Sequence, residues 1–316
     1  MFTFYLLGYI DINKYNKYGR YNKKYNFIKL TIMSNKNYEA QWSSAHPGLL
    51  VILLDQSGSM LSPMNGVNET RTVYATKAVN RVINSIINKN FYKDKPKNRA
   101  FISVIGYNHD VNDIASDYIQ NLAKNPKRID TIKKKVPDDA GGLVETTEEM
   151  PIWVDPIDKD GATNMKGAFE LAKDIVNKWL SQNTDVLAPA PVIVNVSDGV
   201  PYYEGKDPSI CMNETEQVVE EIKKISNADG NVLIFNACIG DGSRSVFPTK
   251  EEELSDEEGK FLFRISSIIP EGYKEAADKN GLNYEAGARG CIAGANAIDL
   301  IQLINFGSSK GQGDFK

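Results

Sequence analysis

Residues 49–60 read LLVILLDQSGSM, and this stretch decides the fold. Its six apolar residues stop abruptly at Asp55, and serines follow at alternate positions, Ser57 and Ser59. A continuous apolar run of this length is typical of a parallel strand that is buried on both faces. The stretch therefore predicts a central strand whose end carries an acidic turn rich in hydroxyl groups.

Two kinds of apolar pattern alternate along the rest of the chain. Continuous apolar runs predict strands, and apolar residues three or four positions apart predict amphipathic helices. The expected strands are 49–54, 100–107, 192–196 and 232–239, with 150–154 as the best candidate in the irregular segment 108–160. The expected helices begin at Asn68 or Thr70 and at Thr163, and two more cover 214–226 and 297–306. This alternation predicts an α/β fold with a doubly wound, mostly parallel central sheet flanked by helices.

The composition limits the classes of protein to consider. At 316 residues, 41% of them hydrophobic, the chain is long enough for one large α/β domain or two small ones. A net charge of −4 gives no basic excess for phosphates, so we expect no nucleic-acid partner. The three cysteines, far apart in sequence, argue against a disulfide framework or a zinc cluster, which favours a cytoplasmic location. No apolar run approaches the roughly 20 residues that span a bilayer, so we expect no transmembrane segment.

The first 32 residues differ from the rest of the chain. They contain six Lys or Arg residues and one Asp, and their positive charge follows the apolar stretch. A secretory signal has the opposite order, so this segment does not resemble one. We expect a basic N-terminal extension at 1–32 that contributes little to the fold. It is either a surface or membrane-touching segment or the product of an upstream start before Met33, and we favour the second reading.

Oxygen-bearing side chains follow two of the expected strands and precede one helix. Asp55, Ser57 and Ser59 follow the first strand, Asp198 follows the strand at 192–196, and Thr163 stands just before a helix. In an open α/β sheet, ligands bind beyond the carboxyl ends of the strands, so these loops can converge. Two carboxylates and three hydroxyls, without imidazole or thiolate, favour a hard cation, Mg²⁺ or Mn²⁺.

These five residues, in this order, resemble the metal-ion-dependent adhesion site (MIDAS) of von Willebrand factor type A (VWA) domains. The resemblance covers about 45–306, with insertions around 108–160 and 241–281 and a flexible tail at 307–316. It implies the Rossmann-like VWA fold. The DQSGSM motif looks closest to prokaryotic intracellular members of the tellurite-resistance (TerY-like) type, which are associated with kinases and phosphatases.

The resemblance also implies a binding mechanism. Ser57 and Ser59 would bind the metal directly, Thr163 directly or through water, and Asp55 and Asp198 largely through water. A metal held by neutral hydroxyls keeps much of its positive charge, so it would accept an Asp or Glu carboxylate from a partner protein. The implied function is a metal-dependent interaction module in an intracellular bacterial signalling or stress-response complex. Components of kinase, phosphatase or AAA-type ATPase systems are the expected partners.

Two aromatic residues follow Asp198 closely. Tyr202 and Tyr203 would stand on the rim of the metal face, where aromatic side chains often anchor an interface. We therefore consider both as possible partner contacts.

The alternative function is that of a Mg²⁺-dependent phosphohydrolase or phosphotransfer enzyme that uses Asp55. The chain has no phosphate loop and no nucleophile elbow, and its two histidines, His46 and His109, have no motif context of a general base. The glycine-rich segment 285–296 lacks the context of a dinucleotide motif and predicts a loop before the last helix. We therefore expect no enzymatic activity.

Overall fold

Strand β1 (Gly48–Asp55) confirms the strand expected from the opening stretch, and all eight of its residues are buried. The computed structural model describes residues 38–64, 67–137, 142–240 and 242–309. The extension expected at 1–32 and the last seven residues of the expected tail, 310–316, lie outside the described residues. Gly307, which we expected to open the tail, instead ends the last helix.

β1 lies in the middle of a seven-stranded sheet with the order β10-β11-β9-β8-β1-β4-β5. The five inner strands are parallel, and β10 and β5 pair antiparallel at the two ends. The other strands of this sheet are β4 (Ala100–Tyr107), β5 (Val111–Tyr118), β8 (Val192–Ser197), β9 (Leu233–Cys238), β10 (Ser245–Val246) and β11 (Cys291–Ala293). The chain passes from β1 to β4 on one side and then returns to β8 on the other, so the strand order reverses beside β1. This is the doubly wound sheet that the sequence predicts.

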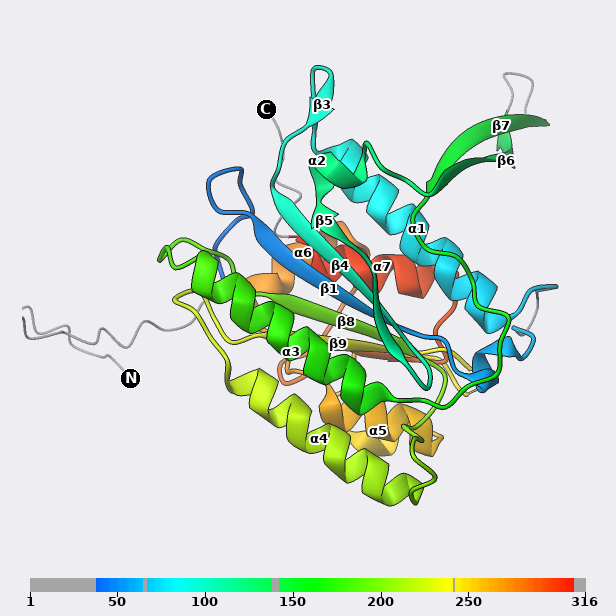
Figure 1. Cartoon of the computed structure of the whole chain (residues 1–316), viewed down its shortest axis with the longest axis vertical. Coiled ribbons are helices and arrows are strands. Elements are labelled where there is room, and N and C mark those ends of the chain that lie inside the picture. Colours follow the sequence, from blue (N-terminus) through cyan, green and yellow to red (C-terminus); the bar gives the residue numbers. More distant parts are fainter. Residues whose placement is uncertain (1–37, 65–66, 138–141, 241, 310–316) are drawn as a thin grey trace, which may run out of the picture. The chain divides into compact units, whose positions relative to one another are not determined.

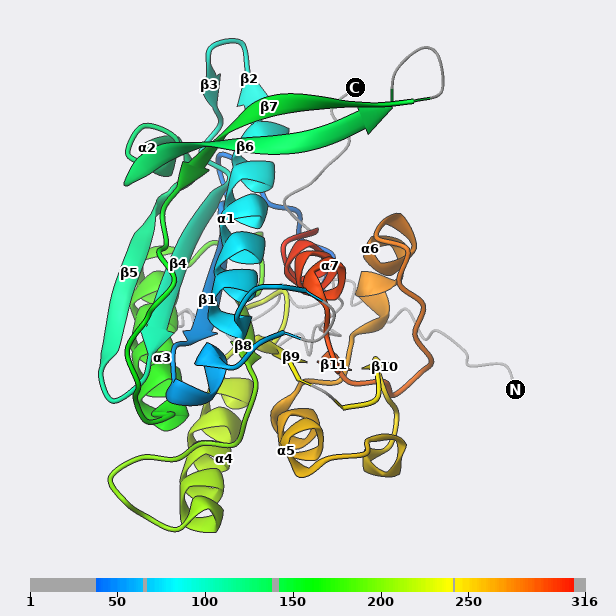
Figure 2. The same ribbon diagram turned by 90° about the vertical axis from the view of Figure 1, so that its right-hand side faces the viewer.

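Helices cover both faces of the sheet. One apolar core joins the sheet to α1 and α7, and a second joins it to α3, α4 and α5. Figure 1 shows α3 and α4 in front of the strands, and Figure 2 shows α1 and α7 together on the other side. The helices are α1 (Arg71–Lys89), α2 (Ile119–Leu122), α3 (Met165–Gln182), α4 (Pro208–Lys224), α5 (Glu257–Ile265), α6 (Lys274–Lys279) and α7 (Ala297–Gly307), with short 3-10 turns at Gly58–Leu61, Glu251–Glu253 and Glu271–Tyr273.

Two segments contain more regular structure than the sequence predicts. The irregular segment 108–160 contains β5, α2 and a two-stranded antiparallel ribbon of β6 (Arg128–Pro137) and β7 (Leu143–Ile152). This ribbon projects beside α1 (Figure 2). The segment 285–296 is not entirely a loop, because β11 lies within it and pairs with β9. A further small hairpin joins β2 (Phe91–Tyr92) to β3 (Lys95–Pro96).

The helices fit globular packing. Each longer helix presents one apolar stripe to the sheet, and its opposite face carries polar residues. Within the described ranges, no helix combines the length and the apolar character needed to cross a membrane.

Candidate metal centre

The parallel pairing of β1 with β8 determines where the candidate site lies. Leu54 pairs with Val196, so the ends of the two strands stand side by side and Asp55 and Asp198 emerge next to each other. This position is at the carboxyl edge of the sheet, beside the reversal in strand order, where α/β folds bind ligands. Hydrogen bonds then connect four of the five residues that the sequence singles out.

Asp55 is fully buried and both of its carboxylate oxygens accept hydrogen bonds. The backbone N–H of Ser57 donates to Oδ1 over 2.8 Å, and the hydroxyl of Ser197 donates to Oδ2 over 2.5 Å. Burial and the nearby charge of Asp198 nevertheless raise the pKa of Asp55 to about 7. The two carboxylates therefore repel each other in the metal-free chain, a tension that a bound cation would relieve.

A chain of hydroxyl groups leads from the first strand to Asp198. The hydroxyls of Ser57 and Ser59 are 3.1 Å apart, and that of Ser59 donates to Oδ1 of Asp198 over 2.7 Å. The two serines thus point to the same side of their turn, as the alternate spacing predicts. Four of the five expected ligands are consequently joined by hydrogen bonds within one cluster.

Arg71 is a member of the site that the sequence did not reveal. Its Nη1 donates to Oδ2 of Asp198 over 2.7 Å, and the Asp198 side chain is completely shielded from solvent. The guanidinium lies at the start of α1 and supplies positive charge to one of the two carboxylates. No motif in the sequence marks Arg71, because its role depends on where the start of α1 lies in space.

Thr163 belongs to a loop that is tied to the other two loops through the backbone. Thr163 and Tyr202 exchange two backbone hydrogen bonds, of 2.7 and 3.1 Å, which fixes this loop beside Asp198. Two residues earlier, the carbonyl of Gly161 accepts a bond from the N–H of Gly58 over 2.9 Å. Thr163 is buried, and no direct hydrogen bond joins its side chain to the Ser57–Ser59–Asp198 chain among the described residues.

Gly58 lies close to the loop that bears Thr163. A Cβ added at Gly58 would lie 1.8 Å from Oδ1 of Asp160. Any side chain at this position would therefore displace the Asp160 carboxylate, whose Oδ1 accepts a hydrogen bond from the N–H of Gly161 over 2.8 Å. Asp160 is a further carboxylate beside the site, in the motif DGATN, and no feature of the sequence marks it as a ligand.

The two tyrosines expected on the rim differ in exposure. Tyr202 is 49% exposed, whereas only 4% of Tyr203 is exposed. The hydroxyl of Tyr203 donates to Glu214 over 2.8 Å, so this ring supports the loop from within. The structure thus places Tyr203 inside the loop and not on the exposed rim where we expected it, whereas Tyr202 is exposed there.

The donor set fits a hard divalent cation. Asp55, Asp198 and the three hydroxyls offer oxygen atoms only, which suits Mg²⁺ or Mn²⁺ rather than a soft metal. Among the described residues, no group of three or more His, Cys, Asp or Glu side chains forms an alternative metal cluster. The cysteines at 211, 238 and 291 are each buried and free.

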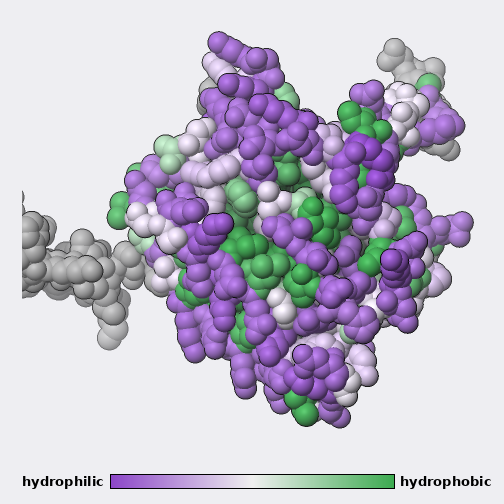
Figure 3. Space-filling view, viewed as in Figure 1, coloured by the Kyte–Doolittle hydropathy of each residue, from purple (hydrophilic) through white to green (hydrophobic). Residues whose placement is uncertain are grey.

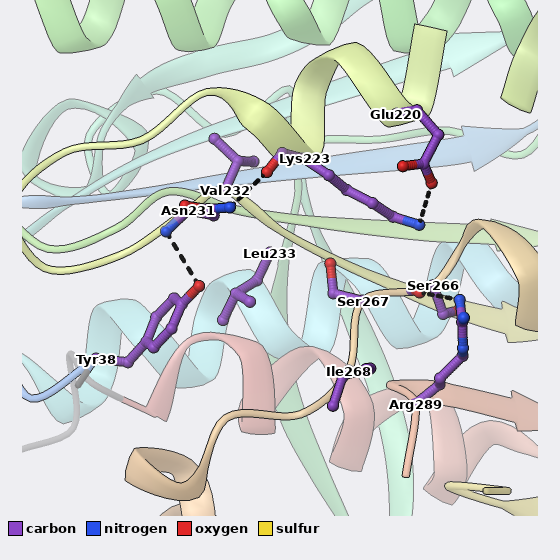
Figure 4. Close-up of a pocket in the computed structure, with 10 residues that line it drawn as sticks. All are labelled: Tyr38, Glu220, Lys223, Asn231, Val232, Leu233, Ser266, Ser267, Ile268 and Arg289. Atoms are coloured by element: carbon purple, nitrogen blue, oxygen red, sulfur yellow. Dashed lines mark hydrogen bonds and ion pairs between the residues drawn. The ribbon is translucent and has the colours of Figure 1, made fainter. Parts of the chain in front are cut away.

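Two cationic side chains, Lys223 and Arg289, line a separate pocket of about 310 Å³, but the pocket does not suit an anion (Figure 4). Lys223 donates to Glu220 over 3.0 Å, and Arg289 donates to three backbone carbonyl groups. Both cations are therefore already engaged within the fold. We assign no function to this pocket.

Comparisons with known proteins show similarity at the level of structure. No protein-family model and no curated protein matches the chain. The solved structures similar to it include the conserved hypothetical protein BatB from Bacteroides thetaiotaomicron, with 12% identity and a TM-score of 0.40, covering 84% of this chain and 100% of that one. They also include the vWF domain of the type V pili tip protein Mfa5 from Porphyromonas gingivalis, with 20% identity and a TM-score of 0.28.

A third similar structure is the ArnB paralog VWA2 from Sulfolobus acidocaldarius, with 14% identity and a TM-score of 0.32. The chain spans 39% of the Mfa5 chain and 36% of the VWA2 chain, and these matches cover 49% and 62% of its own length. Structures similar to this chain thus include vWF and VWA domains. The α/β fold class itself follows from the strand order of the chain, with five parallel strands and a reversal beside β1.

Proposed function

We propose that the chain is a metal-dependent protein-interaction module of the von Willebrand factor type A kind. Asp55, Ser57, Ser59, Thr163 and Asp198 would hold Mg²⁺ or Mn²⁺ as a MIDAS. The metal would supply an electrophilic centre for one carboxylate group of a partner protein. The chain's own residues would position the metal and shield it from solvent on the side that faces the sheet.

One observation carries this proposal. The serine hydroxyls join the turn after β1 to Asp198 after β8, and the Thr163 loop is fastened to both turns through Gly58 and Tyr202. Three segments that are distant in sequence therefore present oxygen atoms at one end of the sheet. Such preorganisation reduces the conformational cost of binding a metal.

The burial of Asp55 favours binding over catalysis. A nucleophile must reach its substrate, whereas Asp55 is fully buried and both of its oxygens accept hydrogen bonds. We therefore propose that the chain is not an enzyme. Mg²⁺-dependent turnover of a phosphoester by the purified chain, lost in Asp55→Asn, would contradict this view.

The metal can be tested directly by calorimetry. We expect Mn²⁺ to bind the full chain at one site, and Ser59→Ala and Thr163→Ala to weaken that binding. A matched control is Ser181→Ala, because Ser181 is an exposed serine near the end of α3. Undiminished Mn²⁺ affinity in both site variants would show that the metal does not bind at this edge of the sheet.

The partner and its location form the second part of the proposal. We expect the partner to come from a kinase, phosphatase or AAA-type ATPase system in the bacterial cytoplasm, on the basis of the motif's resemblance alone. Pull-down from a lysate of the source cells with Mg²⁺ and with EDTA should give a protein retained only with Mg²⁺ and lost with Ser59→Ala. Recovery of the chain at the cell surface on fractionation would contradict the cytoplasmic location.

A further inference from the structure

Helix α1 and the ribbon β6–β7 enclose a pocket of about 490 Å³. Figure 2 shows the ribbon beside this helix, and Figure 3 shows hydrophobic side chains among hydrophilic ones on the ribbon. The α1 residues in the lining follow the helical spacing of three or four positions and so form one stripe of the helix: Val73, Thr76, Lys77, Asn80 and Arg81. Pockets that bind small molecules have volumes of roughly 300–1,000 Å³, so this one is large enough for such a ligand.

Asn80 fastens the chain that follows β7 to α1 at one end of this pocket. Its Oδ1 accepts hydrogen bonds from the N–H groups of Trp153 and Val154, over 2.9 and 3.1 Å. Its Nδ2 donates to the carbonyl groups of Val154 and Thr76, over 2.8 and 3.1 Å. Every polar atom of this buried amide group is therefore engaged, and the pocket is formed before any ligand binds, which reduces the cost of binding.

Thr76 lines the pocket and carries an unsatisfied polar atom. The residue is only 2% exposed, and its hydroxyl has no hydrogen-bond partner among the described residues. A buried hydroxyl without a partner costs free energy, which a polar ligand atom in the pocket would recover. The other lining side chains near it are apolar: Val73, Ile132, Met150, Ile152, Val154 and Pro156. A ligand for this pocket therefore needs an apolar body that carries one polar atom.

Positive charge predominates among the charged side chains of the lining, which are four cations and one carboxylate: Lys77, Arg81, Arg128, Lys133 and Asp130. The carboxylate of Asp130 already accepts a hydrogen bond from Arg128 over 2.8 Å. The other ion-pair partners of these cations, Glu69, Glu145 and Asp155, lie outside the lining. Exposed ion pairs of this kind contribute little free energy, so their cations can turn to another anion.

Arg81 distinguishes this pocket from a purely apolar one. Its side chain is exposed, and it forms no ion pair with a described residue. A guanidinium group can donate two parallel hydrogen bonds to the oxygens of one anionic group. An available cation beside apolar walls therefore fits a ligand that carries one negative charge.

We propose that the pocket between α1 and the ribbon binds a small organic acid with an apolar body. The anionic group of the ligand pairs with Arg81, and the body packs on the apolar walls formed by Val73 and Ile152. A polar atom of the body bonds to the hydroxyl of Thr76. The pocket shares no residue with the candidate metal centre, so this binding does not depend on the metal.

The probe is anilinonaphthalene sulfonate (ANS), which has an aromatic body, an N–H group and one sulfonate, and whose fluorescence rises in an apolar site. Phenylnaphthylamine is the matched ligand, because it has the same body and N–H group without the sulfonate. Each is titrated into the full chain in EDTA and again with Mn²⁺. We expect ANS to bind saturably with one ligand per chain, more tightly than phenylnaphthylamine, and with an affinity that Mn²⁺ leaves unchanged.

The matched variants are Arg81→Glu and Lys274→Glu, which reverse an exposed cation on α1 and one on α6, outside the pocket. We expect about a tenfold loss of ANS affinity in the first and none in the second. The affinity for phenylnaphthylamine should change in neither, because that ligand has no charge. Thr76→Val removes the buried hydroxyl at nearly constant volume and should weaken both ligands without lowering the melting temperature.

Three results would overturn the proposal: no saturable ANS binding, an ANS affinity that Arg81→Glu leaves unchanged, or an equal loss of both ligands in that variant. Undiminished binding of both ligands by Thr76→Val would overturn the placement of the ligand in this pocket. Sedimentation with phosphatidylglycerol vesicles tests a membrane lipid as the source of the anionic group. We expect the chain to stay in the supernatant, and cosedimentation that Arg81→Glu abolishes would overturn the assignment of a small soluble acid.

Discussion

Asp55 carries an unfavourable charge in the metal-free chain. Its carboxylate is buried beside that of Asp198, and its pKa is raised to about 7 by burial first and by that charge second. The bonds from Ser57 and Ser197 offset only part of this cost. A buried carboxylate that costs folding free energy is typical of a binding site and not of a residue that stabilises the fold.

The first prediction concerns Asp55→Asn. Above pH 7 the variant lacks the buried negative charge, so the metal-free chain should be more stable by roughly 1–3 kcal/mol. The same variant should lose Mn²⁺ binding. Denaturant unfolding in EDTA and calorimetry with Mn²⁺ measure the two effects, and a less stable variant would show that Asp55 supports the metal-free fold.

The second prediction concerns Arg71→Gln. The Arg71 side chain is 14% exposed and that of Asp198 is fully shielded, so the loss of the guanidinium leaves a buried carboxylate without its cation. We expect the metal-free chain to lose about 3 kcal/mol of unfolding free energy. Saturating Mn²⁺ should reduce that loss, because the metal supplies positive charge to the same carboxylate.

Arg244→Gln is the matched control for Arg71→Gln. Arg244 pairs with Asp299, another carboxylate shielded from solvent. Asp299 caps the start of α7 and does not belong to the metal centre. This variant should also be less stable, but Mn²⁺ should leave its deficit relative to the wild type unchanged. Equal rescue of both variants by Mn²⁺ would show that the metal acts on the whole fold and not on Asp198.

At the scale of elements, the site depends on the close approach of two loops. The third prediction is that Gly58→Ala displaces the Asp160 carboxylate and breaks its hydrogen bond to the N–H of Gly161, in the loop that leads to Thr163. Mn²⁺ affinity should fall by at least about tenfold, or 1.4 kcal/mol. Gly240→Ala is the control, because a Cβ there has nothing within 4 Å. Calorimetry with Mn²⁺ on both variants tests this prediction. Equal Mn²⁺ affinities of Gly58→Ala and Gly240→Ala would contradict it.

The sequence predicts those elements that are buried. β1, β4, β8 and β9 are apolar runs in a parallel sheet, and their bounds agree with expectation to within one or two residues. α4 begins at Pro208 rather than 214, because Asp207 caps it and accepts from the N–H of Ser209. An Asp-Pro pair is a signal for the start of a helix, so the sequence alone could have predicted this boundary.

The ribbon β6–β7 could not be predicted in the same way. Its strands, RIDTIKKKVP and LVETTEEMPI, carry many charged residues and no sustained apolar alternation. Strand propensity reports mainly on packing against a buried surface, and much of this ribbon is exposed. The short strand β11 could not be predicted for another reason. Its three residues lie in a glycine-rich segment and form a strand only because β9 lies beside them.

At the scale of the whole molecule, strand order converts a sequence motif into a site. The sequence alone could identify four residues as candidate metal ligands, because each follows or lies near an apolar strand: Asp55, Ser57, Ser59 and Asp198. Arg71 and Ser197 were not, since their roles depend on how β1, β8 and α1 are placed in space. Local patterns identify a candidate ligand, whereas the neighbours that tune its charge come from tertiary structure.

The last prediction joins the site to the stability of the whole domain through pH. Asp55 has a pKa of 3.8 in an unperturbed chain and about 7 in the fold, so between these values the folded state binds more protons than the unfolded state. Stability that arises from this carboxyl group must therefore fall as pH rises from about 4 to about 7 in EDTA. Metal binding needs the ionised form, so stabilisation by Mn²⁺ must rise over the same window.

The difference in unfolding free energy between wild type and Asp55→Asn isolates this carboxyl group from other titrating residues. In EDTA the wild type should lose stability relative to the variant as pH rises to about 7, and saturating Mn²⁺ should remove most of that loss. The slope should therefore be negative in EDTA and close to zero in saturating Mn²⁺, because the metal displaces the proton that the metal-free fold binds. Parallel slopes in EDTA and Mn²⁺ would show that the metal does not contact the environment of Asp55, and the candidate centre would then be wrong.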